Sequence, residues 1–211
     1  MIGPEYAEVV SDFAEFGVSA FTTTRAFGTL SAASDEPARA VFGRWDALRD
    51  AARAEGASRF ATAHQVHGAH VVRHVLGWDG WLRAGNADGH FAPTRGTALG
   101  VTIADCVPVF IAHPRGAVAL LHSGWRGTAA RIVEQGITRF TASGLHAREL
   151  RIHLGPAICG KCYEVSADVA SQVLGVAQTA TRTVNLREVI ADHARGAGVR
   201  EITTSAFCTK C

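Results

Sequence analysis

Residues 117–143 read AVALLHSGWRGTAARIVEQGITRFTAS, and this stretch decides which fold class the sequence predicts. The apolar run at 117–122 is typical of a buried strand. The residues at 128–143 repeat apolar side chains at helical spacing, and Gly144 supplies a stop signal. A strand that passes through a glycine-rich turn into a helix is a unit of mixed α/β proteins.

Further segments of both kinds flank this unit. Helices are predicted at 35–57, Ser166–Leu174 and 185–196, and strands at 16–24, 70–76, 98–104, 107–112 and 149–154. Asp35 is expected to cap the first of these helices, and Pro37 suits its first turn. The stretch Gly77–Arg95 is rich in Gly, Trp and Asp, so we predict a mobile loop there. We therefore predict one α/β or α+β domain over residues 1–211.

Composition and charge exclude several classes of protein. The chain of 211 residues is 47% hydrophobic and 19% charged, with a formal net charge of +2. A chain of this kind folds without disulfides, and its weak charge argues against a nucleic-acid partner. We find neither an apolar run of ~20 residues nor a secretory signal at the start, so we expect no membrane partner. A cytoplasmic protein is expected, with its five cysteines outside disulfides.

The first candidate site is the segment AHQVHGAH, which holds His64, His67 and His70 and is followed by His74. On a strand, His64, His70 and His74 would share one face and His67 would take the other. The adjacent valines and Gly68 favour a strand, a turn and a second strand, which would separate the histidines. Each of them is then either a metal ligand or a polar surface group.

Two further candidates lie at predicted strand ends, where α/β proteins place reactive groups. Asp105 and Cys106 end one apolar run, and the alternative for the cysteine is a small buried thiol. His122 ends another, and Arg126 follows in the glycine-rich turn. Arg126 and the helix N-terminus after Gly127 could bind phosphate or carboxylate. The alternative is a tight turn with an arginine that faces solvent.

One cysteine and two histidines can hold a zinc ion and leave a fourth position open, which is the catalytic arrangement. Zinc acidifies a bound water and so supplies a nucleophile at neutral pH. Thiolate and imidazole ligands suit zinc or copper. The chain has no His-x-His pair, and this argues against an oxidase with several copper ions.

Two CxxC pairs form a separate feature, Cys159-Gly-Lys-Cys162 and Cys208-Thr-Lys-Cys211. They are consistent with a structural four-cysteine zinc site, with redox or disulfide chemistry, or with unpaired thiols. The 45 residues between the pairs exceed the usual zinc-ribbon loop, so the spacing leaves these alternatives open.

The motifs HQVHG, TIADCVPVF, LHSGWRGT and GPAICGKCYEV occur here in that order. Together they resemble the YfiH family, also called the laccase-domain, multicopper polyphenol oxidase or peptidoglycan-editing-factor family. The resemblance runs from Gly17 to Cys208. It implies a single-domain four-layer α/β/β/α sandwich, like the catalytic domain of cytotoxic necrotizing factor toxins. It also implies a zinc site on His67, Cys106 and His122, with copper as the less favoured metal.

The resemblance further implies an activity. Family members are similar to purine nucleoside phosphorylases that act on adenosine, inosine and methylthioadenosine and also deaminate adenosine. The implied partners are thus a nucleoside and phosphate. The residues that the resemblance adds to the metal ligands are Arg25, Arg126 and Gly127 for phosphate, Asp105 or His67 for proton transfer, and Gln65 and Asp88 for the shape of the pocket.

The chain also departs from the family pattern. The usual Ser-Tyr-Arg-Arg tail after Cys-Thr is absent, and Ala-Phe-Gly-Thr-Leu-Ser at 26–31 replaces Gly-Gly-Val-Ser. These departures affect the substrate more than the metal. An alternative function is a Cys–His amidase that edits a peptidoglycan precursor, with Cys106 as nucleophile and His122 as its base. Polyphenol oxidase-like activity and a non-enzymatic scaffold with zinc on the CxxC pairs are the others. The oligomeric state is left open.

Overall fold

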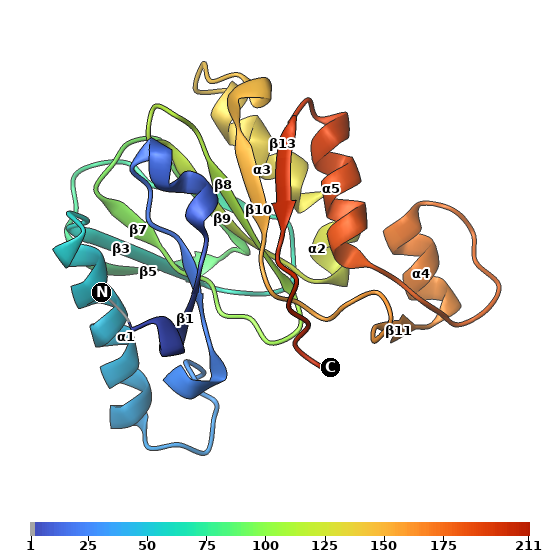
Figure 1. Ribbon diagram of the computed structural model, residues 1–211, viewed down its shortest axis with the longest axis horizontal. Coiled ribbons are helices and arrows are strands. Elements are labelled where there is room, and N and C mark those ends of the chain that lie inside the picture. The colour runs from blue at the N-terminus through green and yellow to red at the C-terminus, as the bar shows by residue number, and fades with distance from the viewer. Residues whose placement is uncertain (1–2) are drawn as a thin grey trace.

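Two β-sheets stacked between helices form the centre of the fold, which a computed structural model describes for residues 3–211 (Figure 1). The larger sheet has six strands in the order β13 (Glu201–Thr204), β10 (Arg151–Leu154), β8 (Val107–Ala112), β9 (Val118–Ser123), β6 (Gly89–Ala92) and β4 (Val71–Arg73). The smaller sheet has the parallel strands β5 (Gly80–Asn86), β3 (Arg59–His64) and β7 (Thr97–Leu99).

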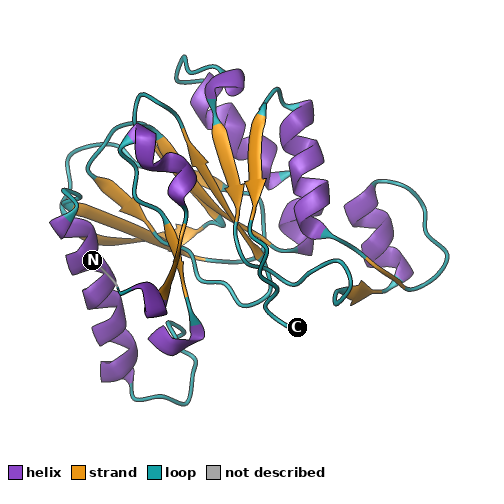
Figure 2. Ribbon diagram, viewed as in Figure 1, coloured by secondary structure: helices purple, strands orange, loops and turns teal. Residues whose placement is uncertain are grey.

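Short strand pairs and helices complete the architecture (Figure 2). The strand pairs are β1 (Ala7–Val9) with β2 (Phe21–Thr23) and β11 (Glu164–Val165) with β12 (Arg182–Thr183). The α-helices are α1 (Ala38–Ala54), α2 (Trp125–Ala129), α3 (Ile132–Thr141), α4 (Ala167–Leu174) and α5 (Leu186–Gly196). The 3-10 helices are η1 (Pro4–Tyr6), η2 (Ser11–Phe16), η3 (Arg25–Phe27) and η4 (Ala147–Glu149). Within residues 3–211, no helix is long and apolar enough to cross a membrane.

The β8–β9 pair forms the centre of the larger sheet because its side chains are apolar on both faces. On one face, Ile111 and Leu121 join the core beneath α3 and α5. On the other face, Phe110 and Leu120 pack in a second core with residues of η2, such as Phe13. The alternation of side chains along a strand thus lets one sheet build two cores.

The smaller sheet is covered by α1, which lies beside β3 and β5 in Figure 1. Val41 and Trp45 of this helix pack on Phe60 of β3. The Trp45 ring also lies 5.5 Å from the ring of Trp81 on β5. The order of layers is therefore helices, larger sheet, smaller sheet and helix, as the family resemblance implies, and the predicted α/β fold is confirmed.

The predicted elements agree with the structure to different degrees. The strand at 107–112 and the helices at 166–174 and 185–196 agree to within one residue, and the strands at 117–122 and 149–154 are shifted or shortened slightly. The strands predicted at 16–24, 70–76 and 98–104 reduce to β2, β4 and β7. The helix predicted at 35–57 is α1, but no side chain caps it, so the prediction for Asp35 is wrong.

The helix predicted at 128–143 is wrong as a single element. Helix α2 already begins at Trp125, and the chain leaves helical geometry at Arg131, whose φ is 58°. Helix α3 then starts at Ile132, and Arg131 donates to Glu134 at 2.6 Å within its first turn. The break separates α2, which stays at the strand end, from α3, which packs on β9, β6 and β4.

The mobile loop predicted at Gly77–Arg95 is also wrong, because this stretch forms β5 and β6. Strand β6 is buried along its length and pairs with β4 and β9. A Cβ at Gly89 would lie 2.7 Å from a methyl group of Leu121 and 2.9 Å from one of Val71. The glycine therefore permits close packing inside a sheet, which is its other role beside that in turns.

A buried histidine pair predicts how stability depends on pH. His90 on β6 and His74 after β4 are joined through Nδ1 and Nε2 at 2.9 Å. Burial lowers the pKa of His90 to about 3, with a further lowering from His74 and an opposing effect of Asp88. The unfolded chain has the ordinary pKa of 6.5, so it binds this proton first. We expect stability to fall as the pH drops from about 6.5 towards 3, on the order of 4 kcal/mol for this group.

Urea unfolding between pH 7 and pH 4 measures this dependence. The variant His90→Gln keeps a polar side chain that does not titrate, so its stability should fall less steeply over this range. The matched control is His146→Gln, which removes an exposed histidine and should keep the steepness of the wild type. An unchanged slope in His90→Gln would contradict the prediction.

Candidate metal centre

Three potential metal ligands converge at one end of the larger sheet. Cys106 directly precedes β8, His122 is near the end of β9, and His67 lies in the turn after β3. The antiparallel register pairs Pro108 with His122 and Val107 with Ser123, and this brings Cys106 beside His122. One potential ligand atom from each of the three residues lies within 4.8 Å of the others. The structure thus gathers the set that the resemblance implies.

His67 has an unusual backbone. Its φ of 60° lies in the left-handed region, which costs energy for a residue with a side chain and is common at functional sites. The side chain is exposed, and its ring lies 4.8 Å from that of His122 at an interplanar angle of 80°. The turn therefore holds the imidazole at the entrance of the site, above the buried His122.

The carboxylate of Asp88 organises the centre. Its Oδ2 accepts hydrogen bonds from the N–H groups of Gly68 at 2.7 Å and Val66 at 3.2 Å. Its Oδ1 accepts from the His67 N–H at 2.9 Å and pairs with His122 Nδ1 at 2.8 Å. Burial works to raise the pKa of Asp88, but the hydrogen bonds from His122 and the three N–H groups outweigh it and lower that pKa. One buried charge thus fixes both the His67 turn and the His122 ring.

Asp88 also determines which nitrogen of His122 can bind a metal. An ionised carboxylate only accepts hydrogen bonds, so Nδ1 of His122 carries the proton and Nε2 keeps its lone pair. Burial lowers the pKa of His122, against the hydrogen bond and charge of Asp88, so the ring is neutral at pH 7. A neutral imidazole that donates its other N–H to a carboxylate is the usual form of a histidine bound to zinc.

The thiol of Cys106 needs a cation to ionise. Burial raises its pKa to about 11, and the negative charges of Asp105 and Asp88 contribute to the increase. In the metal-free protein the group is therefore a thiol at neutral pH. A bound divalent cation would displace the proton, because a coordinating sulfur is a thiolate. This environment suits a metal ligand better than a free nucleophile.

The raised pKa gives a test on the metal-free protein. Alkylation of Cys106 by iodoacetamide should speed up about tenfold for each pH unit from 7 to 10, because only the thiolate reacts. Peptide mass spectrometry measures this rate separately from those of the other cysteines. Reloading with metal should block the reaction. A rate that levels off near pH 8.5, the value of an ordinary thiol, would contradict the assignment.

The two glycines of the GWRG turn allow it to approach the ligands. A Cβ at Gly124 would lie 2.8 Å from the Cys106 sulfur and 3.4 Å from Cδ2 of His67. A Cβ at Gly127 would lie 3.0 Å from the carbonyl oxygen of Gly68. A side chain at either position would displace the turn or the ligand that it contacts.

Arg126 lies next to the centre and is exposed. Its guanidinium stacks 4.2 Å from the centre of the Trp125 ring, and within residues 3–211 it forms no ion pair. The first hydrogen bond of α2 runs from Thr128 N–H to the Gly124 carbonyl at 2.8 Å. The preceding N–H groups, including that of Gly127, have no partner inside the helix. The helix starts earlier than predicted, yet it places these N–H groups beside the arginine.

The structure places the remaining predicted residues around the centre. The Arg25 guanidinium donates to the Thr209 carbonyl at 2.6 Å, and the Thr209 hydroxyl donates to the Asp105 carboxylate at 2.5 Å. The side-chain amide of Gln65 makes three hydrogen bonds with Thr102, at 2.7 to 2.9 Å. Gln65 thus joins the His67 turn to the segment before Cys106. Contacts of Arg25, Gln65 and Asp105 with a substrate stay predictions.

Comparison with known proteins places the chain in a family. The sequence model described as "Multi-copper polyphenol oxidoreductase laccase" matches residues 15–211. The chain belongs to this family. A solved member of similar fold, the hypothetical protein YfiH of Bacillus licheniformis, has a TM-score of 0.83 at 22% identity and covers 100% of this chain and 89% of its own. The predicted relationship to YfiH proteins is confirmed.

Relatives of this family member carry enzyme names. A purine nucleoside phosphorylase of Streptomyces griseus is 34% identical over 154 residues, which are 69% of this chain and 63% of that protein. One of Mycobacterium tuberculosis is 32% identical over 206 residues, which are 89% of this chain and 81% of that protein. An adenosine deaminase of an unknown prokaryotic organism is 28% identical over 134 residues, 56% of this chain and 50% of that protein. The chain thus spans less than two thirds of some of these relatives.

The other histidines of the AHQVHGAH segment lie apart from the centre. His64 Nδ1 is 3.4 Å from the Arg83 guanidinium, and His70 Nδ1 is 3.0 Å from the Asn86 carbonyl. Among the described residues of this segment, His67 alone joins Cys106 and His122. The family resemblance selects this histidine correctly, whereas the pattern of strands and turns left it open.

Sequence reasoning gave two residues too small a part. Asp88 was assigned only to the shape of the pocket, although its acidic side chain directly before Gly89 and an apolar stretch could have marked a buried carboxylate. Tyr163, in the CYEV motif, was not considered. Burial and the charges of Cys106 and Asp105 raise its pKa, and Arg126 opposes them. The Tyr163 phenol therefore lies within electrostatic reach of the same centre.

Proposed function

We propose that the protein is a zinc-dependent purine nucleoside phosphorylase that also deaminates adenosine. The observation that carries this proposal is the group of His67, Cys106 and His122, oriented by Asp88 and placed beside the unpaired Arg126. The names of the relatives support the choice of purine nucleosides. The proposed partners are a nucleoside and phosphate, and the proposed catalytic unit is one domain over residues 1–211.

The ligand types favour zinc over copper. Two imidazoles and one thiolate leave a tetrahedral ion one open position, which is how catalytic zinc is held. Within residues 3–211, the other group that could hold a metal consists of four cysteines, so no second histidine-rich site is present for a cluster of copper ions. When bound, zinc would supply a Lewis acid and an acidified water for attack on the purine ring.

Phosphorolysis requires phosphate beside the anomeric carbon of the nucleoside. The guanidinium of Arg126 and the adjacent N–H groups of α2, including that of Gly127, are proposed to hold it, with Arg25 as a second contact. The C1′–N9 bond breaks, a phosphate oxygen bonds to C1′, and the departing purine takes up a proton. Asp105 or His67 is the proposed proton carrier. The products are ribose 1-phosphate and the free base.

Deamination exchanges the amino group of adenosine for an oxygen from water. The purine carbon gains the oxygen, and ammonia leaves after it has taken up a proton. The same carriers, Asp105 or His67, are proposed to move this proton from the attacking water. The reaction needs no phosphate, so the two activities can be separated by the anion contacts alone.

The proposal is tested by incubating zinc-loaded protein with adenosine or inosine, with and without inorganic phosphate. Liquid chromatography should show free base from either nucleoside only when phosphate is present. It should also show inosine formed from adenosine without phosphate. Removal of metal with a chelator should stop both reactions, and zinc should restore them. If the metal-loaded protein yields neither free base nor inosine, the proposal is overturned.

Substitution of Arg126 should separate the two activities. We expect Arg126→Ala to raise the KM for phosphate by roughly 10- to 100-fold, as the loss of charged hydrogen bonds worth about 1.5–3 kcal/mol implies. Deamination of adenosine should change less than about threefold. Arg148→Ala removes an exposed arginine of η4 and is the matched control. An equal loss of both activities in Arg126→Ala would contradict a role in phosphate binding.

The amidase alternative draws on the same residues. Cys106, His122 and Asp88 follow one another in the order of a nucleophile, a base and its orienting acid. The pKa of Cys106, which burial raises to about 11, disfavours a thiolate nucleophile in the absence of metal. Rapid alkylation of metal-free Cys106 at pH 7 would favour the amidase.

A further inference from the structure

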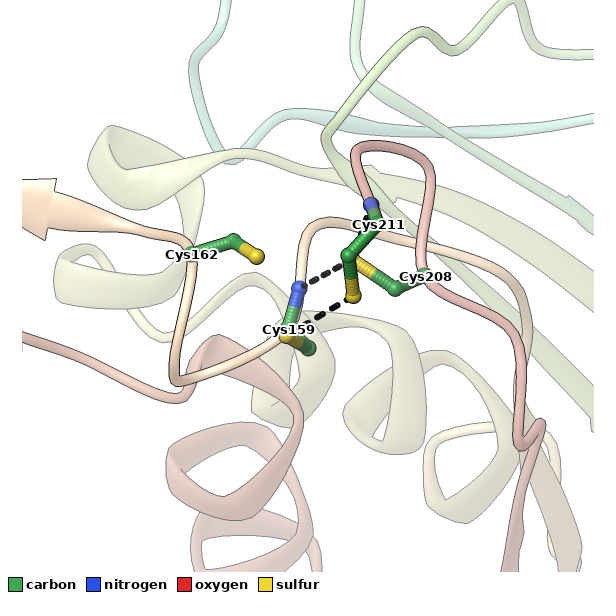
Figure 3. A group of neighbouring side chains, drawn as sticks. All are labelled: Cys159, Cys162, Cys208 and Cys211. Carbon is green, nitrogen blue, oxygen red and sulfur yellow. Dashed lines mark hydrogen bonds between the residues drawn. The ribbon is translucent and has the colours of Figure 1, made fainter.

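The four cysteines of the CxxC pairs meet at the C-terminal end of the chain (Figure 3). Cys159 and Cys162 lie in the loop between β10 and β11, and Cys208 and Cys211 follow β13. Strands β10 and β13 run parallel as neighbours, and the bridge between Ala157 and Cys208 continues this pairing into the loops. The topology of the sheet thus joins two sequence segments that are far apart.

The distances among these thiols match a shared metal ion. All four sulfur atoms lie within 4.8 Å of one another, and those of Cys159 and Cys211 are 4.0 Å apart. Two sulfur ligands at about 2.3 Å on a tetrahedral zinc ion are separated by about 3.8 Å. A disulfide would instead join the sulfurs in pairs at about 2.05 Å. All four cysteines are free in the structure.

The backbone around Cys208 favours an ionised sulfur. Its Sγ accepts the N–H groups of Cys159 at 3.3 Å, Lys210 at 3.4 Å and Cys211 at 3.5 Å. Hydrogen bonds of this kind stabilise a thiolate and orient it toward a metal. The two lysines inside the pairs, Lys161 and Lys210, add positive charge. They would offset the net charge of −2 that four thiolates and one Zn²⁺ carry.

We propose that Cys159, Cys162, Cys208 and Cys211 bind a structural zinc ion, separate from the His67, Cys106 and His122 centre. Four thiolates fill all positions of tetrahedral zinc, so the ion has no place for a substrate. Its role is to fasten the last residues of the chain to the 159–162 loop. Thr209, between two of the ligands, contacts both Arg25 and Asp105. The zinc ion thereby holds this residue at the border of the other centre.

The test measures zinc per chain by mass spectrometry in the Cys106→Ala background, which removes a ligand of the other centre. Full-length protein is reduced, loaded with zinc and freed of unbound metal. We expect about one tightly held zinc ion per chain, and its loss on adding Cys159→Ser and Cys208→Ser. If Cys106→Ala takes up no zinc, or if its zinc survives both serine substitutions, the proposal is overturned.

Two further measurements guard against variants that fail to fold. Cys211→Ser changes an exposed terminal residue and should leave the fold intact, as far-ultraviolet circular dichroism can check. Cobalt bound to Cys106→Ala should show intense thiolate charge-transfer absorption that weakens when Cys211→Ser is added. Hydrogen exchange of residues 205–211 should be at least about tenfold slower with zinc than without it. Absorption or exchange that does not change overturns the proposal.

Discussion

Replacement of Cys106 by alanine is expected to lower the rate of phosphorolysis roughly a thousandfold, a loss of about 4 kcal/mol in transition-state stabilisation. The reason is that the thiolate supplies negative charge and one of three proposed protein bonds to the metal. Alanine leaves two imidazoles, which bind zinc weakly without a third ligand. Steady-state assays of base release and zinc content should therefore decrease together.

A matched pair of histidine variants controls for indirect effects. His67→Ala should behave like Cys106→Ala, because His67 is in the same ligand group. His64→Ala removes a histidine that is also exposed and lies three residues earlier, but contacts Arg83. It should keep both zinc and activity. Equal losses in the two histidine variants, or full activity in Cys106→Ala, would contradict the assignment of ligands.

Asp88→Asn is expected to weaken zinc binding by about 10- to 100-fold, the usual effect of losing the carboxylate behind a metal-bound histidine. An asparagine cannot accept the hydrogen bonds of both His122 and the 66–68 turn, because its NH₂ group would face a donor. We also expect a loss of about 2–3 kcal/mol in the free energy of unfolding, since buried donors are left unpaired.

Competition with a chromogenic chelator measures the affinity for zinc, and urea unfolding of the metal-free protein measures stability. Asp50→Asn removes an exposed carboxylate of α1 and should change neither quantity. A variant of Asp88 with the zinc affinity of the wild type would show that His67 and His122 hold their positions without this carboxylate.

The parts of the fold that sequence predicted well are those with an unmixed signal. The run at 107–112 is apolar throughout and forms a strand buried on both faces. The helices at 166–174 and 185–196 have regular apolar spacing, and Ser166 caps the first of them by accepting from Val169 N–H. Local chemistry determines such elements, so it can be recognised without the rest of the chain.

Elements that depend on distant contacts were not predictable in this way. Strand β6 contains Asp88 and Gly89 at its start, and its glycine is explained only by the side chains of Val71 and Leu121 across the sheet. The break at Arg131 likewise depends on how α3 packs. Local signals treat such glycine and aspartate residues as marks of a loop.

The candidate site shows the same division. Strand ends indicated Cys106 and His122 as reactive positions, and the β8–β9 register brings them together. No periodicity could select His67, because its position depends on a turn that is held by Asp88 of another strand. The family motif supplied that residue, and the structure supplied the reason for it. The meeting of the CxxC pairs required the β10–β13 pairing as well.

The central claim is that His67, Cys106 and His122 hold one zinc ion. Anomalous X-ray diffraction at the zinc absorption edge, from crystals of zinc-loaded protein, tests it most directly. The account predicts an anomalous peak bonded to the Cys106 sulfur and to a ring nitrogen of both histidines, with the Asp88 carboxylate behind His122. Zinc-loaded crystals without a peak among these three residues would contradict it.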